Sequence, residues 1–359
     1  MKIPCIASLF RLAGKSLALA LIASSTWAAD VVKLPAYQVD LRQTSVSGLS
    51  SGAFMAAQFQ VAYSGTLVGA GLIAGGPFYC AGSSSLTPYL FNAQTICMNP
   101  SSGAAPNADT LLAQAKIFAQ SGLIDDLANL KKEKVYLFSG IADRTVTTAV
   151  VDQTAAFYKK AGLPANNIKY IHNIDAGHSI ITNNSKDVAC ATTAAPYIND
   201  CKFIQSHDIL NHIYDNLKPP VSTLSGKLIK FDQSEFIHSF ISSMSDTAYA
   251  YVPKSCEAQT CKVHVVFHGC QQGASTIGNL FYTTTGYNEL ADANDMIVLY
   301  PQIEPSNGYL FGYGYNPQGC WDFWGYSSLN PFSPNFYSKK APQMAAVKAM
   351  LDRLAQPRK

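Results

Sequence analysis

The chain of 359 residues has few charges and little excess of one sign. Asp, Glu, Lys and Arg make up 14% of it, and its formal net charge is +3. If residues 1–28 are removed, as argued below, Lys plus Arg falls from 26 to 23 and equals the 23 acidic residues. Without a basic field we expect neither nucleic acid nor an anionic membrane as a partner. A neutral surface suits an uncharged substrate.

A metal-binding cysteine pattern, an internal repeat and an interdomain linker are also missing. No two cysteines have the Cys-x-x-Cys spacing typical of zinc sites. No stretch rich in Pro, Thr and Ser separates a second module. We therefore expect one large domain, residues 29–359, with no separate substrate-binding domain. We expect no metal and no cofactor.

The first 28 residues are typical of a secretory signal peptide. Three basic residues and no acidic one precede Asp30, and an apolar run, Ser16 to Ser25, follows them. That run is too short to span a bilayer, which needs about 20 apolar residues. We expect cleavage after Ala28, with Ala29 as the alternative. The remaining protein would be a monomer, exported to the periplasm or the medium.

The cysteine count agrees with export. The chain has nine cysteines, and loss of Cys5 with the signal peptide leaves an even set of eight. In an oxidising compartment this indicates four disulfides, although eight cysteines allow 105 connectivities. Short separations favour three pairs and leave a fourth by elimination: Cys80–Cys97, Cys190–Cys201, Cys256–Cys261 and then Cys270–Cys320.

The stretch from Thr44 to about Tyr63 is predicted to form a strand, a tight turn and a helix. Its turn, Gly48-Leu-Ser-Ser-Gly52, places Ser50 at the centre of a Gly-x-Ser-x-Gly pattern. In this context the pattern is typical of the nucleophile elbow of an α/β-hydrolase. The two glycines would avoid collisions between strand and helix. We predict Ser50 as a nucleophile in a strained conformation; without catalytic partners the same residues would be an ordinary turn.

A nucleophilic serine needs a histidine base and a carboxylate that orients the histidine. In α/β-hydrolases the acid and then the base follow the serine, on loops after later strands. Asp143 follows a predicted strand at 134–138, and His178 follows another at 168–174. We therefore predict Asp143 as the acid and His178 as the base.

Other candidates for these two roles are less well placed. Asp175 is the main rival acid, but it lies only three residues from His178 on the same loop. Asp152 falls within a predicted helix. His172 lies inside a predicted strand, and His207 and His212 share a helix at a spacing that does not suit a metal site.

The order of strands and helices predicts the fold class. Strand-like and helix-like segments alternate up to His178, which favours a mostly parallel central sheet flanked by helices. Closely spaced β-prone segments follow at 249–252, 262–267 and 295–300, and a closing helix at 343–354.

One motif stands at an unusual place in this order. The oxyanion loop of such hydrolases often carries His-Gly after an early strand. Here His268-Gly269-Cys270-Gln271-Gln272 comes after the predicted base. The order is that of a circular permutation, and it makes His268 part of a loop and not the base.

These features together resemble one family. The Ser…Asp…His order, the late His-Gly-Cys-Gln-Gln and the segment Gly319-Cys-Trp-Asp-Phe-Trp-Gly325 are similar to the secreted, circularly permuted, fungal-type poly(3-hydroxybutyrate) depolymerases. The resemblance implies a single-domain α/β-hydrolase with Ser50, Asp143 and His178 as the triad. It implies an oxyanion hole formed by the amides of Ser51 and Cys270. It also implies a substrate crevice lined by a tryptophan of the Cys-Trp segment, for which Trp321 and Trp324 are the candidates.

The implied activity is hydrolysis of poly- or oligo(3-hydroxybutyrate) through an acyl-enzyme. Many aromatic residues between Tyr309 and Tyr337 could contact an apolar polyester or fill the core under long loops. A feruloyl or acetylxylan esterase, or another short-chain carboxylesterase, is the first alternative. A non-catalytic polymer-surface binder is the second.

Overall fold

The computed structural model describes residues 31–101, 105–309 and 312–358. The predicted signal peptide, residues 1–28, lies outside the described residues, as do residues 29–30. The chain from Val31 onward forms one compact unit. Within the described ranges, no helix is both long enough and apolar enough to cross a bilayer.

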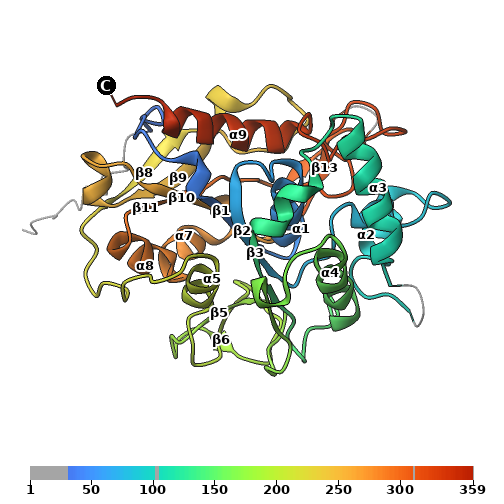
Figure 1. The fold of residues 1–359 in the computed structure, drawn as a ribbon, viewed down its shortest axis with the longest axis horizontal. Coiled ribbons are helices and arrows are strands. Elements are labelled where there is room, and N and C mark those ends of the chain that lie inside the picture. The colour runs from blue at the N-terminus through green and yellow to red at the C-terminus, as the bar shows by residue number, and fades with distance from the viewer. Residues whose placement is uncertain (1–30, 102–104, 310–311, 359) are drawn as a thin grey trace, which may run out of the picture. The chain divides into compact units, whose positions relative to one another are not determined.

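An eight-stranded sheet forms the centre of the fold, in the order β4-β3-β2-β1-β10-β11-β9-β8 (Figure 1). Its strands are β1 Thr44–Leu49, β2 Leu67–Ile73, β3 Lys134–Phe138, β4 Ile168–Ile171, β8 Lys227–Asp232, β9 Thr247–Val252, β10 Lys262–Phe267 and β11 Met296–Tyr300. The strands from β4 to β11 in this order are parallel to one another. β9 is antiparallel to both of its neighbours, β11 and the edge strand β8. β1 pairs with β2 on one side and with the late strand β10 on the other. This order confirms the permuted hydrolase sheet.

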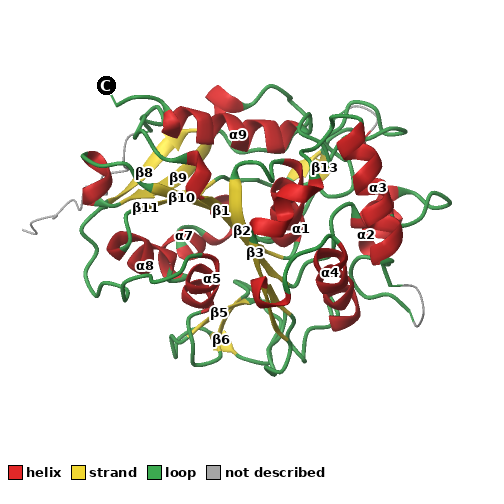
Figure 2. Cartoon of the chain, in the orientation of Figure 1, coloured by secondary structure: helices red, strands yellow, loops and turns green. Residues whose placement is uncertain are grey.

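Helices cover both faces of the sheet (Figure 2). Their bounds are α1 Ser51–Ala62, α2 Tyr89–Gln94, α3 Ala108–Gln120, α4 Thr148–Lys160, α5 Gln205–Ile213, α6 Ala274–Ile277, α7 Leu280–Thr284, α8 Tyr287–Ala293 and α9 Pro342–Ala355. α1 and α4 lie on one face and are joined by a 2.6 Å hydrogen bond from the Tyr158 hydroxyl to Gln60 Oε1. α5 packs on the other face, where its isoleucines cover Gly69 and Gly71 of β2.

The burial of α1 explains its composition. Every residue of this helix is buried, so it has no polar face and consists mainly of Ala, Phe, Met and Val. Its two glutamines are satisfied inside the protein: Gln58 Nε2 donates to the carbonyl of Asp322, and Gln60 Nε2 donates to Glu133. The helix that begins at the elbow is therefore fixed along its whole length.

Two smaller sheets extend the loops. β5 Ile180–Thr182, β6 Val188–Ala189 and β7 Ile198–Asp200 form one after His178, and β12 Ser306–Asn307 pairs with β13 Tyr315–Asn316 in the other. Four disulfides cross-link the loops. Three are the pairs favoured by short spacing, and the fourth is the pair left by elimination: Cys80–Cys97, Cys190–Cys201, Cys256–Cys261 and then Cys270–Cys320.

Candidate active site

Ser50 occupies the sharp turn between β1 and α1. Its backbone has φ 57° and ψ −124°, a conformation that L-residues rarely adopt. A side chain at Gly48 would collide with the backbone of Gly52, and one at Gly52 would collide with the carbonyl of Phe267. The elbow therefore requires both glycines for the steric reason that the sequence pattern indicated.

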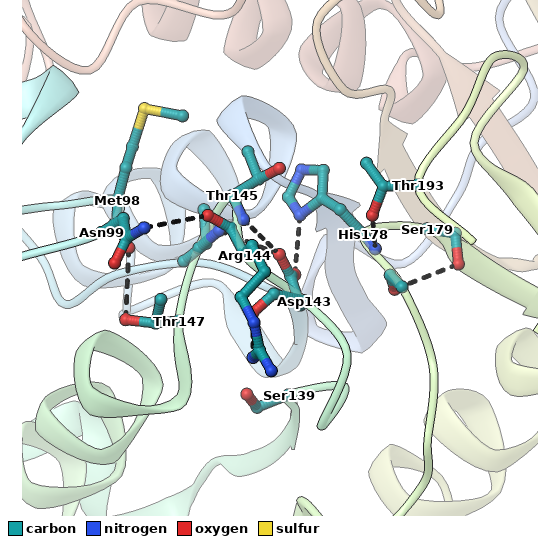
Figure 3. A network of polar contacts seen from close by, with 12 residues as sticks. Met98, Asn99, Ser139, Asp143, Arg144, Thr145, Thr147, His178, Ser179 and Thr193 are labelled. Carbon is teal, nitrogen blue, oxygen red and sulfur yellow. Dashed lines mark hydrogen bonds and ion pairs between the residues drawn. The ribbon is translucent and has the colours of Figure 1, made fainter. Parts of the chain in front are cut away.

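Asp143 and His178 come from neighbouring strand ends and meet beside the elbow. Asp143 Oδ2 lies 2.7 Å from His178 Nδ1 (Figure 3). Asp143 is only 2% exposed, and its other oxygen, Oδ1, accepts the amides of Thr145 and Val146 at 2.8 and 3.0 Å. The His178 amide donates to Thr193 Oγ1 at 2.9 Å, which fixes the loop that carries the ring. Asp175 is exposed and takes no part in this contact.

A cavity of about 420 Å³ joins these groups to the solvent. Ser50 and His178 both line it, whereas Asp143 lies behind His178, outside the lining. No Asp, Glu, Lys or Arg side chain is among the described lining residues. The cavity wall is formed largely by apolar side chains, so it suits a neutral ester better than an ion.

Two backbone amides at this cavity have no partner within the described part of the chain. Ser51 is the first residue of α1, and the amides of a helix's first turn have no partner within the helix. The Cys270 N–H likewise donates no hydrogen bond among the described residues, whereas the next amide, that of Gln271, donates to the carbonyl of Gln318. Both Ser51 and Cys270 line the cavity. Unpaired backbone donors at the cavity that Ser50 lines are the kind of groups that an oxyanion hole uses.

Polar side chains hold the loop that carries Cys270. His268 is fully buried, and Nε2 accepts the amide of Ile303 while Nδ1 lies 2.7 Å from the carbonyl of Gly269. Burial lowers the pKa of His268 to about 4, so the ring is neutral at pH 7 and braces the loop. Gln272 accepts the amide of Gly269 and donates to the carbonyl of Pro196, which ties this loop to the segment around the Cys190–Cys201 disulfide.

The structure separates the two candidate tryptophans. Trp324 is half-buried and lines the cavity. Trp321 is 0% exposed, packs against Phe267 and His268 and does not line the cavity. The expectation that Trp321 contacts substrate therefore does not hold, because its ring lies in the core below the loop.

Several cavity residues were not predicted from the sequence. Phe54 of α1 and Phe323 stack at 4.1 Å between ring centroids, and both line the wall beside Trp324. Tyr197 and Leu90 line it from distant loops. Phe323 belongs to the aromatic segment that the sequence analysis offered as a substrate contact. Phe54, four residues after Ser50 on the elbow helix, also had a positional signal, since one helical turn places it near the cavity.

The described residues offer no metal centre. No group of three or more His, Cys, Asp or Glu side chains among them is arranged to hold a metal ion. A permuted, mostly parallel sheet with an elbow serine directly after an inner strand and an Asp–His pair after later strands is the architecture of an α/β-hydrolase.

Comparison with known proteins identifies the family within this class. No family model matches the chain. It is 44% identical over 331 residues to a poly(3-hydroxybutyrate) depolymerase from Delftia acidovorans, covering 90% of this chain and 62% of that relative. It is 37% identical over 310 residues to a polyhydroxybutyrate depolymerase from Talaromyces funiculosus, covering 83% of this chain and 86% of that relative.

Solved structures agree with these relatives. A serine-to-alanine variant of a PHB depolymerase in complex with an R3HB trimer matches with TM-score 0.79 and 34% identity, over 90% of this chain and 99% of the other. The PHB depolymerase from Penicillium funiculosum matches with TM-score 0.78 and the same identity and coverage. The chain belongs to the poly(3-hydroxybutyrate) depolymerase family.

Proposed function

We propose that this protein is a serine esterase that hydrolyses the ester bonds of poly- or oligo(3-hydroxybutyrate). The observation that carries the proposal is the Asp143–His178 pair, whose histidine lines the same cavity as the elbow serine. The family supports the substrate, because the relative bound to an R3HB trimer shares the fold over 90% of this chain. The chain spans 62% of the length of the Delftia relative, so the activity of that whole protein is not assigned to this chain.

The geometry supports an acyl-enzyme mechanism. Because Asp143 is bonded to His178 Nδ1, Nε2 is the ring nitrogen left to take the proton of Ser50 Oγ. Ser50 Oγ then forms a bond to the ester carbonyl carbon, and the carbonyl oxygen becomes an oxyanion. The amides of Ser51 and Cys270 stabilise that charge. His178 returns the proton to the leaving alcohol, and water attacks the acyl-enzyme by the reverse sequence to release the acid.

Ser50 and His178 of the proposed triad both line the cavity. No hydrogen bond joins Ser50 Oγ to His178 in the structure, and both side chains are nearly buried, at 8% and 6% exposure. Catalytic hydrogen bonds are often long without substrate and shorten in the Michaelis complex. We propose that the hydrogen bond between Ser50 Oγ and His178 Nε2 forms when the ester is bound.

The rim of the cavity is suited to a polyester. Leu90 and Tyr315 line the cavity and are 44% and 54% exposed, and the neighbouring Phe91 is 52% exposed. Apolar side chains at the mouth would contact chain segments that extend beyond the bond being cleaved. Trp324 would contact the part of the chain inside the cavity.

We further propose that the protein is exported. The four disulfides suit an oxidising compartment. In this proposal residues 1–28 are a signal peptide, residues 29–359 are one catalytic domain, and the protein acts as a monomer on its substrate, without a metal or organic cofactor.

Substrate panels test the function. We expect release of 3-hydroxybutyrate units from the trimer and clearing of a polymer suspension, with little release of ferulate or acetate from plant cell-wall esters. The reverse preference would favour a feruloyl or acetylxylan esterase. Polymer adsorption with no ester hydrolysis would leave only a polymer-surface binder.

A further inference from the structure

Asp322 lies in the loop before α9 and is 1% exposed. Its carboxylate accepts five hydrogen bonds from the residues that follow it. Oδ1 accepts the amides of Trp324, Gly325 and Tyr326 at 3.1, 2.6 and 3.2 Å. Oδ2 accepts the amide and the hydroxyl of Ser327 at 3.0 and 2.6 Å. One side chain therefore organises four consecutive residues of the loop.

No cation offsets this buried carboxylate. Among the described residues, no Lys, Arg or His forms an ion pair with Asp322. Burial raises the pKa of the Asp322 carboxyl, while hydrogen bonds from Ser327, Gly325 and Trp324 oppose that rise. Both oxygens act only as acceptors, so an amide in their place would turn an NH₂ group toward backbone N–H donors. Asparagine cannot reproduce the arrangement.

The Asp322 backbone anchors this turn to the catalytic frame. Its amide donates to Gln343 Oε1 of α9 at 2.8 Å. Its carbonyl accepts Gln58 Nε2 of α1, the helix that begins at the nucleophile elbow, at 3.0 Å. The turn is thus fixed to the same helix that positions Ser50.

Of the four residues held by the Asp322 carboxylate, Trp324 lines the cavity, together with its neighbour Phe323 and with Phe54 of α1. Phe323 stacks on Phe54, and Trp324 packs edge-on against Phe323 with ring centroids 5.0 Å apart. All three line the cavity. The Trp324 amide is itself one of the groups bound by Asp322. The position of the Trp324 ring therefore depends on the buried carboxylate.

We propose that Asp322 is a positioning residue that presets the aromatic wall for the chain of an oligomeric ester, and so controls the KM for longer substrates more than the chemical step. This inference rests on the proposed function for its substrate. The placement of Trp324 by Asp322 can be tested without any substrate.

The test variant is Asp322→Asn. A second variant, Ser327→Ala, removes one of the five donors to the Asp322 carboxylate. Asp352→Asn, on the exposed side of α9, is the matched control. Each is made in the full chain with Trp27→Phe, so that Trp321 and Trp324 are the only tryptophans. Acrylamide quenching then reports Trp324, because Trp321 is buried. KM and kcat are measured on a p-nitrophenyl ester and on the 3-hydroxybutyrate trimer, well below each variant's Tm.

For Asp322→Asn we expect stronger acrylamide quenching and a KM for the trimer raised about tenfold, which corresponds to about 1.4 kcal/mol. The rise in KM for the p-nitrophenyl ester should be several-fold smaller than the rise for the trimer. Ser327→Ala should shift both readouts in the same direction by less, and it carries the test if Asp322→Asn does not fold. Asp352→Asn should change neither.

The proposal would be overturned if Asp322→Asn raised the KM equally for the two esters. It would also be overturned if both the quenching and the KM for the trimer were unchanged. If the unsubstituted protein hydrolyses neither ester, the proposed function fails. In that case acrylamide quenching alone tests whether Asp322 positions Trp324. Equal quenching in Asp322→Asn and Asp352→Asn would show that it does not.

Discussion

The two sides of the cavity are built in different ways. On the catalytic side, Ser50, Asp143 and His178 each follow a strand of the main sheet, so hydrogen-bonded strands set their positions. On the aromatic side, residues 315–337 contain only the two-residue strand β13. That side is held mainly by side-chain contacts, among them the Cys270–Cys320 disulfide, the hydrogen bonds of Asp322 and the stacking of Phe323 on Phe54. Substitutions should therefore affect chemistry on the first side, and stability or chain-length preference on the second.

The largest effect is expected at the nucleophile. Ser50→Ala should lower hydrolysis of every ester by about 10⁴ or more, because no other group can form the acyl-enzyme. Ser51→Ala is the neighbouring control. Its hydroxyl only accepts the Trp321 amide at 3.2 Å, so substantial activity should remain. Activity is measured on a p-nitrophenyl ester after circular dichroism has shown that both variants fold. An inactive Ser51→Ala beside an active Ser50→Ala would contradict the assignment.

The acid should come next. Asp143→Asn can keep the Thr145 and Val146 amides on its oxygen, but its NH₂ would then face His178 Nδ1 and favour the wrong tautomer. We expect kcat to fall by about 10⁴ with little change in Tm. Asp175→Asn, on an exposed side chain of the same region, should be mild. If the two variants showed the opposite order, the acid would be Asp175.

The disulfide between the two sides should affect both rate and stability. Cys270–Cys320 spans 50 residues, and loss of such a cross-link costs about 4 kcal/mol in the chain-entropy model. It also holds Cys270, whose amide is the second oxyanion donor in our proposal, and a lost donor lowers the rate by about 10² to 10³. The double variant Cys270→Ala/Cys320→Ala should show a lower Tm and a lower kcat on a small ester. Cys256→Ala/Cys261→Ala, a five-residue bridge away from the cavity lining, is the control and should leave kcat unchanged.

The smallest effect on rate is expected at the tryptophans. Trp324→Ala should raise the KM for the trimer about tenfold, because roughly 1–3 kcal/mol of apolar contact free energy is lost. The KM for the small ester should change little. Trp321→Ala should instead destabilise the fold by about 3–5 kcal/mol, because it leaves a cavity in the core. Thermal unfolding and kinetics on both substrates separate the two. A stable Trp321→Ala with impaired trimer hydrolysis would return that residue to the binding site.

The same contrast explains what the sequence could predict. The elbow, the acid and the base stand next to recognisable strands, so their places follow from the order of the elements, and the sheet order agrees. Trp321 and Trp324 lie in a loop without periodicity, where no pattern tells which ring faces the core. Asp322 stands between them and looks like an ordinary loop aspartate until its five hydrogen bonds are seen. Cavity residues such as Tyr197 come from distant segments and depend on tertiary packing alone.

The central claim is that Ser50 is a nucleophile activated by the Asp143–His178 pair. Reaction with a fluorophosphonate, followed by peptide mass spectrometry, tests it most directly. The account predicts rapid phosphonylation of Ser50 alone in the unsubstituted protein, and far slower labelling in His178→Ala. Labelling at Ser51, no labelling at all, or an equal rate in His178→Ala would contradict it.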